Sequence, residues 1–152
     1  MLRDKLNDAL KDAMRARDTV ALSAIRLILA KLKEVDIAAR TESNREGVAD
    51  DRILSMLQGM IKQRNESVVL YEKGNRTDLA DKEKAEIAII ERFLPQQMDD
   101  AAVDTAVREA IAAAGATSVK DMGGVMAALK GKYAGQMDFA KASAAVKKAL
   151  TG

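Results

Sequence analysis

The sequence predicts an all-α protein, and three observations support that prediction. Apolar residues recur at intervals of three and four along most of the chain, which is the helical period, and no stretch has the pattern of a strand. Aromatic residues are only 3% of the 152 residues and Trp is absent, so aliphatic side chains and Met must fill the core. The single proline, Pro95, separates a longer N-terminal part from a shorter, alanine-rich part.

Before Pro95 the pattern predicts an antiparallel helical bundle over residues 1–95. The four expected helices cover residues 2–16, 19–40, about 50–74 and 77–94. Asp18 is expected to cap the second helix, and Gly74 to end the third in a left-handed conformation. Thr77 or Asp78 is expected to cap the fourth. Residues 41–49 are polar and lack periodicity, so they are expected to form a loop. Short connections favour antiparallel neighbours.

After the proline, residues 96–152 predict a smaller C-terminal helical domain. Its expected helices cover about 99–114, 125–132 and 138–150, with a short irregular element at 117–124 between the first two. Asp99 or Asp100 and Asp138 are expected N-caps. The helices are short and rich in alanine, so their core is thin and this domain is expected to be the less stable one.

The composition excludes several chemistries. Cys and His are both absent, which removes disulfides, thiolate nucleophiles, His-based general-base catalysis and the usual zinc ligands. We therefore expect no metal and no cofactor. The net charge of +2 does not indicate a partner. No apolar run approaches the roughly 20 residues of a membrane span, and the N-terminal residues lack a signal-peptide core, so a cytoplasmic location is the expectation.

Four charged residues fall on faces that the helical pattern makes apolar: Asp36, Arg64, Glu83 and Glu86. Unpaired buried charge is costly, so they are expected to meet in an interhelical ion-pair network around Arg64. Two less favoured readings stay open. One is a ligand pocket, which would serve a small enzyme acting through Arg64, Glu83 and Glu86. The other is a metal site formed by the three carboxylates.

The C-terminal part distributes its charge unevenly. Residues 98–118 contain one Arg against four acidic residues, whereas residues 119–152 contain six Lys against two. The lysines are Lys120, Lys130, Lys132, Lys141, Lys147 and Lys148. A solvated face is one reading. The other is a surface that contacts nucleic-acid phosphates without reading sequence. Aromatic residues are too few for base stacking, so a folded RNA recognised by shape fits better than a single strand.

The pair Gly123-Gly124 also has two readings. It can form a simple turn between two helical segments. It can also allow the backbone to approach a phosphate closely, aided by Lys120 and by the N-terminus of the following helix.

Four segments together resemble the GatB/YqeY family. They are RLILAKLKEVDIAAR (26–40), IKQRNES (61–67), RTDLADKEKAEIAIIERFLPQQM (76–98) and GATSVKDMGGVMAAL (115–129). The order and spacing look like a stand-alone YqeY-like protein, similar to the C-terminal tRNA-contacting module of the GatB amidotransferase subunit. The resemblance implies an all-α fold of two parts and affinity for tRNA or another folded RNA.

The resemblance argues against autonomous amidotransferase activity. The carbon–nitrogen ligase activity with glutamine as amido-N-donor belongs to a larger GatB domain that has no counterpart in this chain. The glycine-rich segment of such proteins usually reads Met-Gly-Lys-Val-Met, and Gly124 stands here in place of the lysine. That departure removes one candidate phosphate contact.

Three hypotheses follow for function. The first is a non-catalytic tRNA- or RNA-binding accessory module related to translation. The second is a protein-interaction adaptor that docks on an amidotransferase or a translation factor. The third is the small enzyme described above. Neither DNA nor a membrane is an expected partner.

Overall fold

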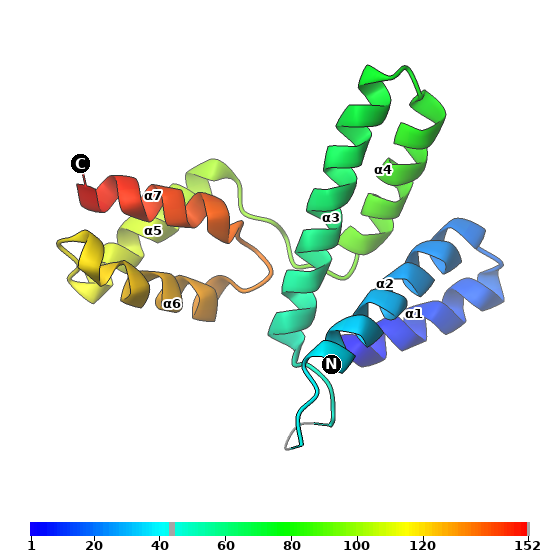
Figure 1. The fold of residues 1–152 in the computed structure, drawn as a ribbon, viewed down its shortest axis with the longest axis horizontal. Helices are drawn as coiled ribbons and strands as arrows, with labels where there is room; N and C mark the ends of the chain where they lie inside the picture. Colours follow the sequence, from blue (N-terminus) through cyan, green and yellow to red (C-terminus); the bar gives the residue numbers. More distant parts are fainter. Residues whose placement is uncertain (43–44, 152) are drawn as a thin grey trace. The chain divides into compact units, whose positions relative to one another are not determined.

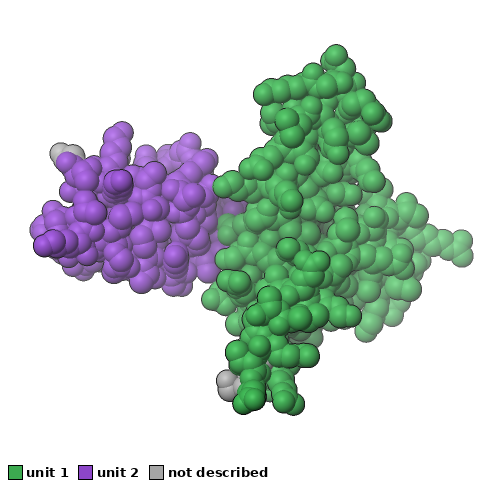
Figure 2. Space-filling view, in the orientation of Figure 1, with its two compact units in different colours: residues 1–95 green, residues 96–152 purple. Residues whose placement is uncertain are grey.

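A computed structural model describes residues 1–42 and 45–151, and residues 43–44 of the expected loop lie outside the described residues. The described chain is helical and contains no strand, so the prediction of an all-α fold is confirmed. The chain divides into two compact units, residues 1–95 (unit 1) and 96–152 (unit 2), coloured separately in Figure 2.

Unit 1 consists of two helical hairpins (Figure 1). Its helices are α1 (Leu2–Ala16), α2 (Thr19–Ala38), α3 (Asp50–Lys73) and α4 (Thr77–Glu91). All four share one apolar core, to which each contributes a fully buried side chain: Leu6, Ile28, Leu57 and Ile90. The two hairpins therefore fold as one body.

The turns of unit 1 follow the predicted chemistry in part. Asp18 caps α2 by accepting a hydrogen bond of 3.0 Å from the N–H of Ala21. Gly74 is not left-handed, with φ −86°; Asn75 takes the left-handed conformation instead, with φ 57°. Asparagine tolerates that region better than most residues. The expected side-chain cap of α4 is absent, because the helix already begins at Thr77 and Arg76 stands at the N-cap position. Asp78 lies in the first turn and pairs with Arg76.

Helix α4 ends earlier than the pattern predicts. Its regular part stops at Glu91, and the next three N–H groups each bond the carbonyl three residues back, which is a tighter turn. Leu94 precedes Pro95, and a residue in that position avoids the helical region. The proline therefore loosens the last turn as well as ending the helix.

Unit 2 contains α5 (Asp100–Ala114), a short 3₁₀ element η1 (Val119–Asp121), α6 (Met122–Tyr133) and α7 (Phe139–Thr151). These helices surround a core of small and medium side chains, of which Val125, Leu129 and Val146 are fully buried. Met137, from the α6–α7 connection, fills the same core.

The first residues after the proline belong to unit 2 by hydrogen bonding. The side-chain amide of Gln97 donates to the carbonyl of Gly135 at 2.6 Å, and the N–H of Met98 donates to the carbonyl of Gln136 at 2.8 Å. Both bonds fix the chain entering α5 to the turn between α6 and α7. Among the described residues, no helix is both long and apolar enough to cross a membrane.

Candidate nucleic-acid interface

All six lysines of the C-terminal part are exposed in the structure. They are Lys120 on η1, Lys130 and Lys132 on α6, and Lys141, Lys147 and Lys148 on α7. The acidic residues of unit 2 do little to neutralise them. Of these six lysines, only Lys141 forms an ion pair with a described residue: its amine lies 3.4 Å from Asp100.

Three of the six acidic side chains of unit 2 accept hydrogen bonds from backbone N–H groups. Asp99 accepts from the N–H of Ala102 at 2.8 Å, and Asp138 accepts from the N–H groups of Ala140 and Lys141. Asp121 accepts from two N–H groups in the segment before α6. Helix capping thus holds three acidic side chains at helix ends, away from ion pairs with lysines.

The lysines do not gather on a single helix face. Lys130 and Lys132 are two residues apart, so they leave α6 about 160° apart around its axis. Lys141 and Lys148 share one stripe of α7, and Lys147 lies about 100° from Lys148. The positive charge therefore surrounds unit 2 as scattered points. Such a surface suits contact with several phosphates better than one precise anion site.

Gly123 and Gly124 lie inside α6, in its first turn, and do not form the irregular segment that the sequence predicts. A helix N-terminus tolerates glycine, and a Cβ added at either position would meet no atom within 4 Å. The open space would allow a phosphate to approach. Asp121 opposes that reading, because backbone hydrogen bonds from Thr117 and Ser118 lower the pKa of its carboxyl and keep it charged beside the same turn.

Arg64 and Glu86 form the most deeply buried ion pair of unit 1. The Arg64 Nε lies 3.1 Å from a Glu86 carboxylate oxygen and 3.8 Å from Glu83, and the side chains of Arg64 and Glu86 are only 15% and 10% exposed. Arg64 also donates to the carbonyl of Met60. The arrangement joins α3 to α4 along the seam where both helices are otherwise apolar.

Asp36 does not pair with Arg64, so the prediction that it belongs to the network around Arg64 is wrong. Arg3 of α1 binds its carboxylate through two bonds of 2.7 and 2.9 Å. The N–H of Val48 donates to it at 2.9 Å, and Arg3 in turn donates to the carbonyl of Val48. The hydrogen bond with Arg3 lowers the pKa of Asp36, and the same bond raises the pKa of Arg3. These contacts tie the loop before α3 to α1 and α2.

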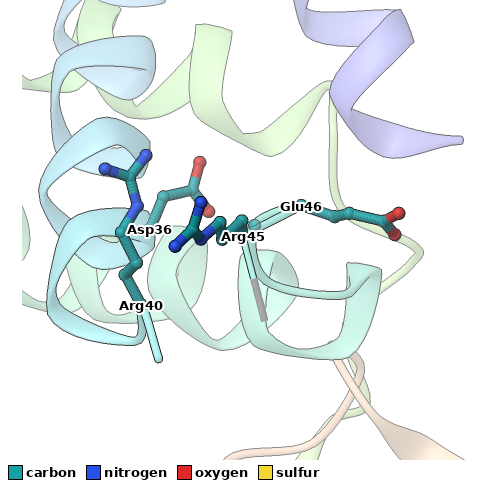
Figure 3. A pocket seen from close by; sticks show the side chains of 5 residues that line it. Asp36, Arg40, Arg45 and Glu46 are labelled. Carbon is teal, nitrogen blue, oxygen red and sulfur yellow. The ribbon is translucent and has the colours of Figure 1, made fainter. Parts of the chain in front are cut away.

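A small hollow of about 90 Å³ lies beside Asp36 (Figure 3). Arg40, Arg45, Glu46 and Gly47 complete its lining. Gly47 has φ 99°, and a Cβ there would lie 2.6 Å from an Arg3 nitrogen. Glycine is thus needed for the loop to pass over the Arg3–Asp36 pair. Sequence reasoning missed Arg3 because its partner lies 33 residues away.

The described residues contain no group of three or more acidic side chains placed to hold a metal ion. Asp36 faces Arg3, while Glu83 and Glu86 face Arg64, so the three carboxylates of the metal hypothesis are not brought together.

Residues 3–150 match the model of the family described as Yqey-like protein. Three yeast relatives carry the name "Altered inheritance of mitochondria protein 41, mitochondrial". The Candida glabrata protein is 34% identical over 60% of this chain and 48% of its own length. The Lachancea thermotolerans protein is 34% identical over 60% and 46%, and the Saccharomyces cerevisiae protein 35% over 60% and 47%. The chain thus matches about half the length of these relatives.

These relatives contradict the expected cytoplasmic location, because each is named as a mitochondrial protein. The expectation rested on the absence of a signal pattern, and an absence of that kind does not exclude a location.

Proposed function

We propose that this chain, which belongs to the Yqey-like family, is a non-catalytic accessory module that binds tRNA or another folded RNA. The observation that carries the proposal is the state of the charges in unit 2. Five exposed lysines have no carboxylate partner within the described residues, while helix caps hold the neighbouring acidic groups. Lysines in that state are available to phosphates, and their binding releases counterions.

The same surface supports a folded RNA over a single strand as the ligand. The lysines are scattered around three elements, and unit 2 has only Tyr133 and Phe139 as aromatic residues, both of which pack against its core. Stacking of unpaired bases therefore has little support. Contact with the phosphates of a folded RNA, recognised by its shape, fits the arrangement better.

The small-enzyme alternative has weaker support. Arg64 and Glu86 satisfy each other across α3 and α4, so neither is left poised for a substrate. The adaptor alternative has support from a different surface, the exposed side of α2.

A salt titration tests the proposal. Binding of total tRNA to the full chain would be followed by fluorescence anisotropy from about 50 to 200 mM salt, the range over which phosphate contacts lose most of their affinity. The quadruple variant Lys130→Gln, Lys132→Gln, Lys147→Gln, Lys148→Gln should bind more weakly. The slope of log affinity against log salt should fall by up to about three, at roughly 0.7–0.9 for each lost contact.

The matched control changes four exposed lysines of unit 1, namely Lys5, Lys11, Lys62 and Lys82, to Gln. The control removes the same total charge and should leave most of the slope intact. An unchanged slope in the unit 2 variant, or equal losses in both variants, would reject the proposed surface. Gly124→Lys provides a gain-of-function arm, because it supplies the lysine that the resemblance implies, and it should strengthen binding.

A further inference from the structure

Helix α2 carries an exposed apolar stripe on the side opposite its core face. The stripe (the α2 outer stripe) consists of Val20, Ser23, Leu27, Ala30, Glu34 and Ile37, all exposed. The spacing alternates three and four, which places these residues within about 100° around the helix. Val20, Leu27 and Ile37 are 50%, 43% and 58% exposed. Three large aliphatic side chains thus lie along the exposed side of one helix, where a partner could cover them.

The flanks of the stripe carry positive charge. Written as a heptad, the stripe occupies the a and d positions. The g positions are then Arg26, Lys33 and, just past the end of α2, Arg40. Lys31 takes an e position and pairs with Glu34 at 3.2 Å. Within the described residues, Arg26 and Lys33 have no carboxylate within ion-pair distance. The stripe therefore combines apolar anchors with unpaired cations along one edge.

A shallow hollow lies beside the α2 outer stripe. It has a volume of about 400 Å³ and lies near the start of α2, lined by Thr19, Leu22, Ser23, Arg26 and Leu27. The small side chain of Ser23 leaves room between Leu27 and the preceding turn for an apolar side chain of a partner. The 20 residues of α2 offer a track about 30 Å long, which matches a helical ligand of similar length.

A second copy of this chain is a poor occupant for electrostatic reasons. Parallel pairing of two α2 helices would place Arg26 of one copy against Lys31 of the other. Antiparallel pairing would place g positions against g positions, so that Lys33 would face Lys33 or Arg26 would face Arg40. Like charges repel in both orientations. A partner with acidic residues at the flanking positions removes the repulsion and adds attraction.

A lipid surface and an RNA fit less well than a protein helix. Helices that lie in a membrane interface usually present Trp, Phe and several Leu, whereas this stripe has no aromatic residue and includes Glu34. RNA phosphates would use the cations but leave the three aliphatic side chains in water. We propose that the α2 outer stripe docks an acidic amphipathic helix of a partner protein, with apolar residues on Val20, Leu27 and Ile37 and carboxylates on Arg26 and Lys33.

The experiment uses the full chain and two synthetic helical peptides of three heptads. Both peptides have Leu at a and d; one has Glu and the other Lys at every e and g position, and the like charges keep each peptide from pairing with itself. Anisotropy of labelled peptide measures the affinity. The Glu peptide should bind wild-type protein about tenfold more tightly than the Lys peptide, because Arg26 and Lys33 attract the carboxylates of the first peptide and repel the amines of the second.

Two variants locate the binding. Leu27→Asp should weaken binding of the Glu peptide by about tenfold or more, because it places a charge where an apolar anchor is buried. Circular dichroism verifies that this variant folds. Leu70→Asp is the matched control, because Leu70 is 67% exposed on α3, away from the stripe. It should leave the affinity unchanged.

The double variant Arg26→Glu, Lys33→Glu is the decisive one. It should lose the Glu peptide and gain the Lys peptide. Equal binding of both peptides to wild-type protein, or equal loss in Leu70→Asp, would overturn the proposal. Self-association abolished by Leu27→Asp would identify a second copy as the occupant. If Arg26→Glu, Lys33→Glu loses tRNA binding but keeps peptide binding, RNA is the ligand of this surface. Either this result or the self-association result would count against an acidic helix as the occupant.

Discussion

Units 1 and 2 are both helical, yet they stabilise themselves differently. Unit 1 supplements its apolar core with ion pairs that are well shielded: Arg64–Glu86, with side chains 15% and 10% exposed, and Arg3–Asp36, at 32% and 23%. The one ion pair of unit 2 within the described residues, Lys141–Asp100, has side chains 64% and 86% exposed. Unit 2 thus depends on packing of small apolar residues, and its charges remain available to a ligand.

The largest expected effects come from core truncation and show whether the units unfold independently. Leu57→Ala in unit 1 and Leu129→Ala in unit 2 should each lower the free energy of unfolding by about 2–5 kcal/mol, because both side chains are fully buried. Each unit contains one tyrosine, Tyr71 or Tyr133, so Tyr133→Phe and Tyr71→Phe backgrounds report on one unit at a time. Urea titration should show that each core variant shifts only its own transition. A shift of both would mean that the units are one cooperative body.

Removal of Arg64 is expected to have the next largest effect, in unit 1 alone. Arg64→Ala leaves the buried carboxylate of Glu86 without its partner and should lower unfolding free energy by about 2–4 kcal/mol. The double variant Arg64→Met, Glu86→Leu removes both charges and should recover most of the loss. If the double variant is as unstable as Arg64→Ala, the loss comes from altered packing between α3 and α4 and not from an unpaired charge.

The Arg3–Asp36 pair is more exposed, and its contribution is correspondingly smaller. Asp36→Asn should cost about 1 kcal/mol. The pKa of Asp36 is lowered in the folded state, so its stabilisation is present above the unfolded value of about 3.9 and is lost as pH falls through the folded pKa. Urea titrations of wild type and variant should therefore converge below about pH 4. If the difference in unfolding free energy between wild type and Asp36→Asn persists at low pH, the charge of Asp36 is not its cause.

The smallest effect concerns unit 2 and has the opposite sign. Gly123→Ala and Gly124→Ala should each raise the unfolding free energy of this unit by up to about 1 kcal/mol, because both positions are helical and the added Cβ meets nothing within 4 Å. Thermal unfolding followed by Tyr133 measures the gain. Gly115→Ala is the contrasting variant: φ is 61° at Gly115, so the same change should destabilise.

Local patterns predicted most of the helices, since each depends on neighbours within a turn or two. The cap at Asp18 belongs to that class. The helical start at Met122 was missed because glycine propensity argues against a helix, and tertiary packing of Val125 overrides it. The misassignment of Asp36 has a different cause. The sequence pattern places Asp36 among apolar residues of α2 and so predicts an ion-pair partner for it. The helix that supplies this partner depends on how α1 packs against α2, which the pattern does not contain.

The junction after Pro95 has a consequence for how strongly the whole molecule can hold a ligand. Leu94 is bonded back to Glu91, and Gln97 and Met98 are bonded into unit 2, so the connection between these two sets of hydrogen bonds is short. A connection this short would keep the two proposed binding surfaces at a high effective concentration, of the order of millimolar for short linkers. An assembly that offers an acidic helix to α2 and phosphates to unit 2 would be held by avidity, and would release when either contact is lost.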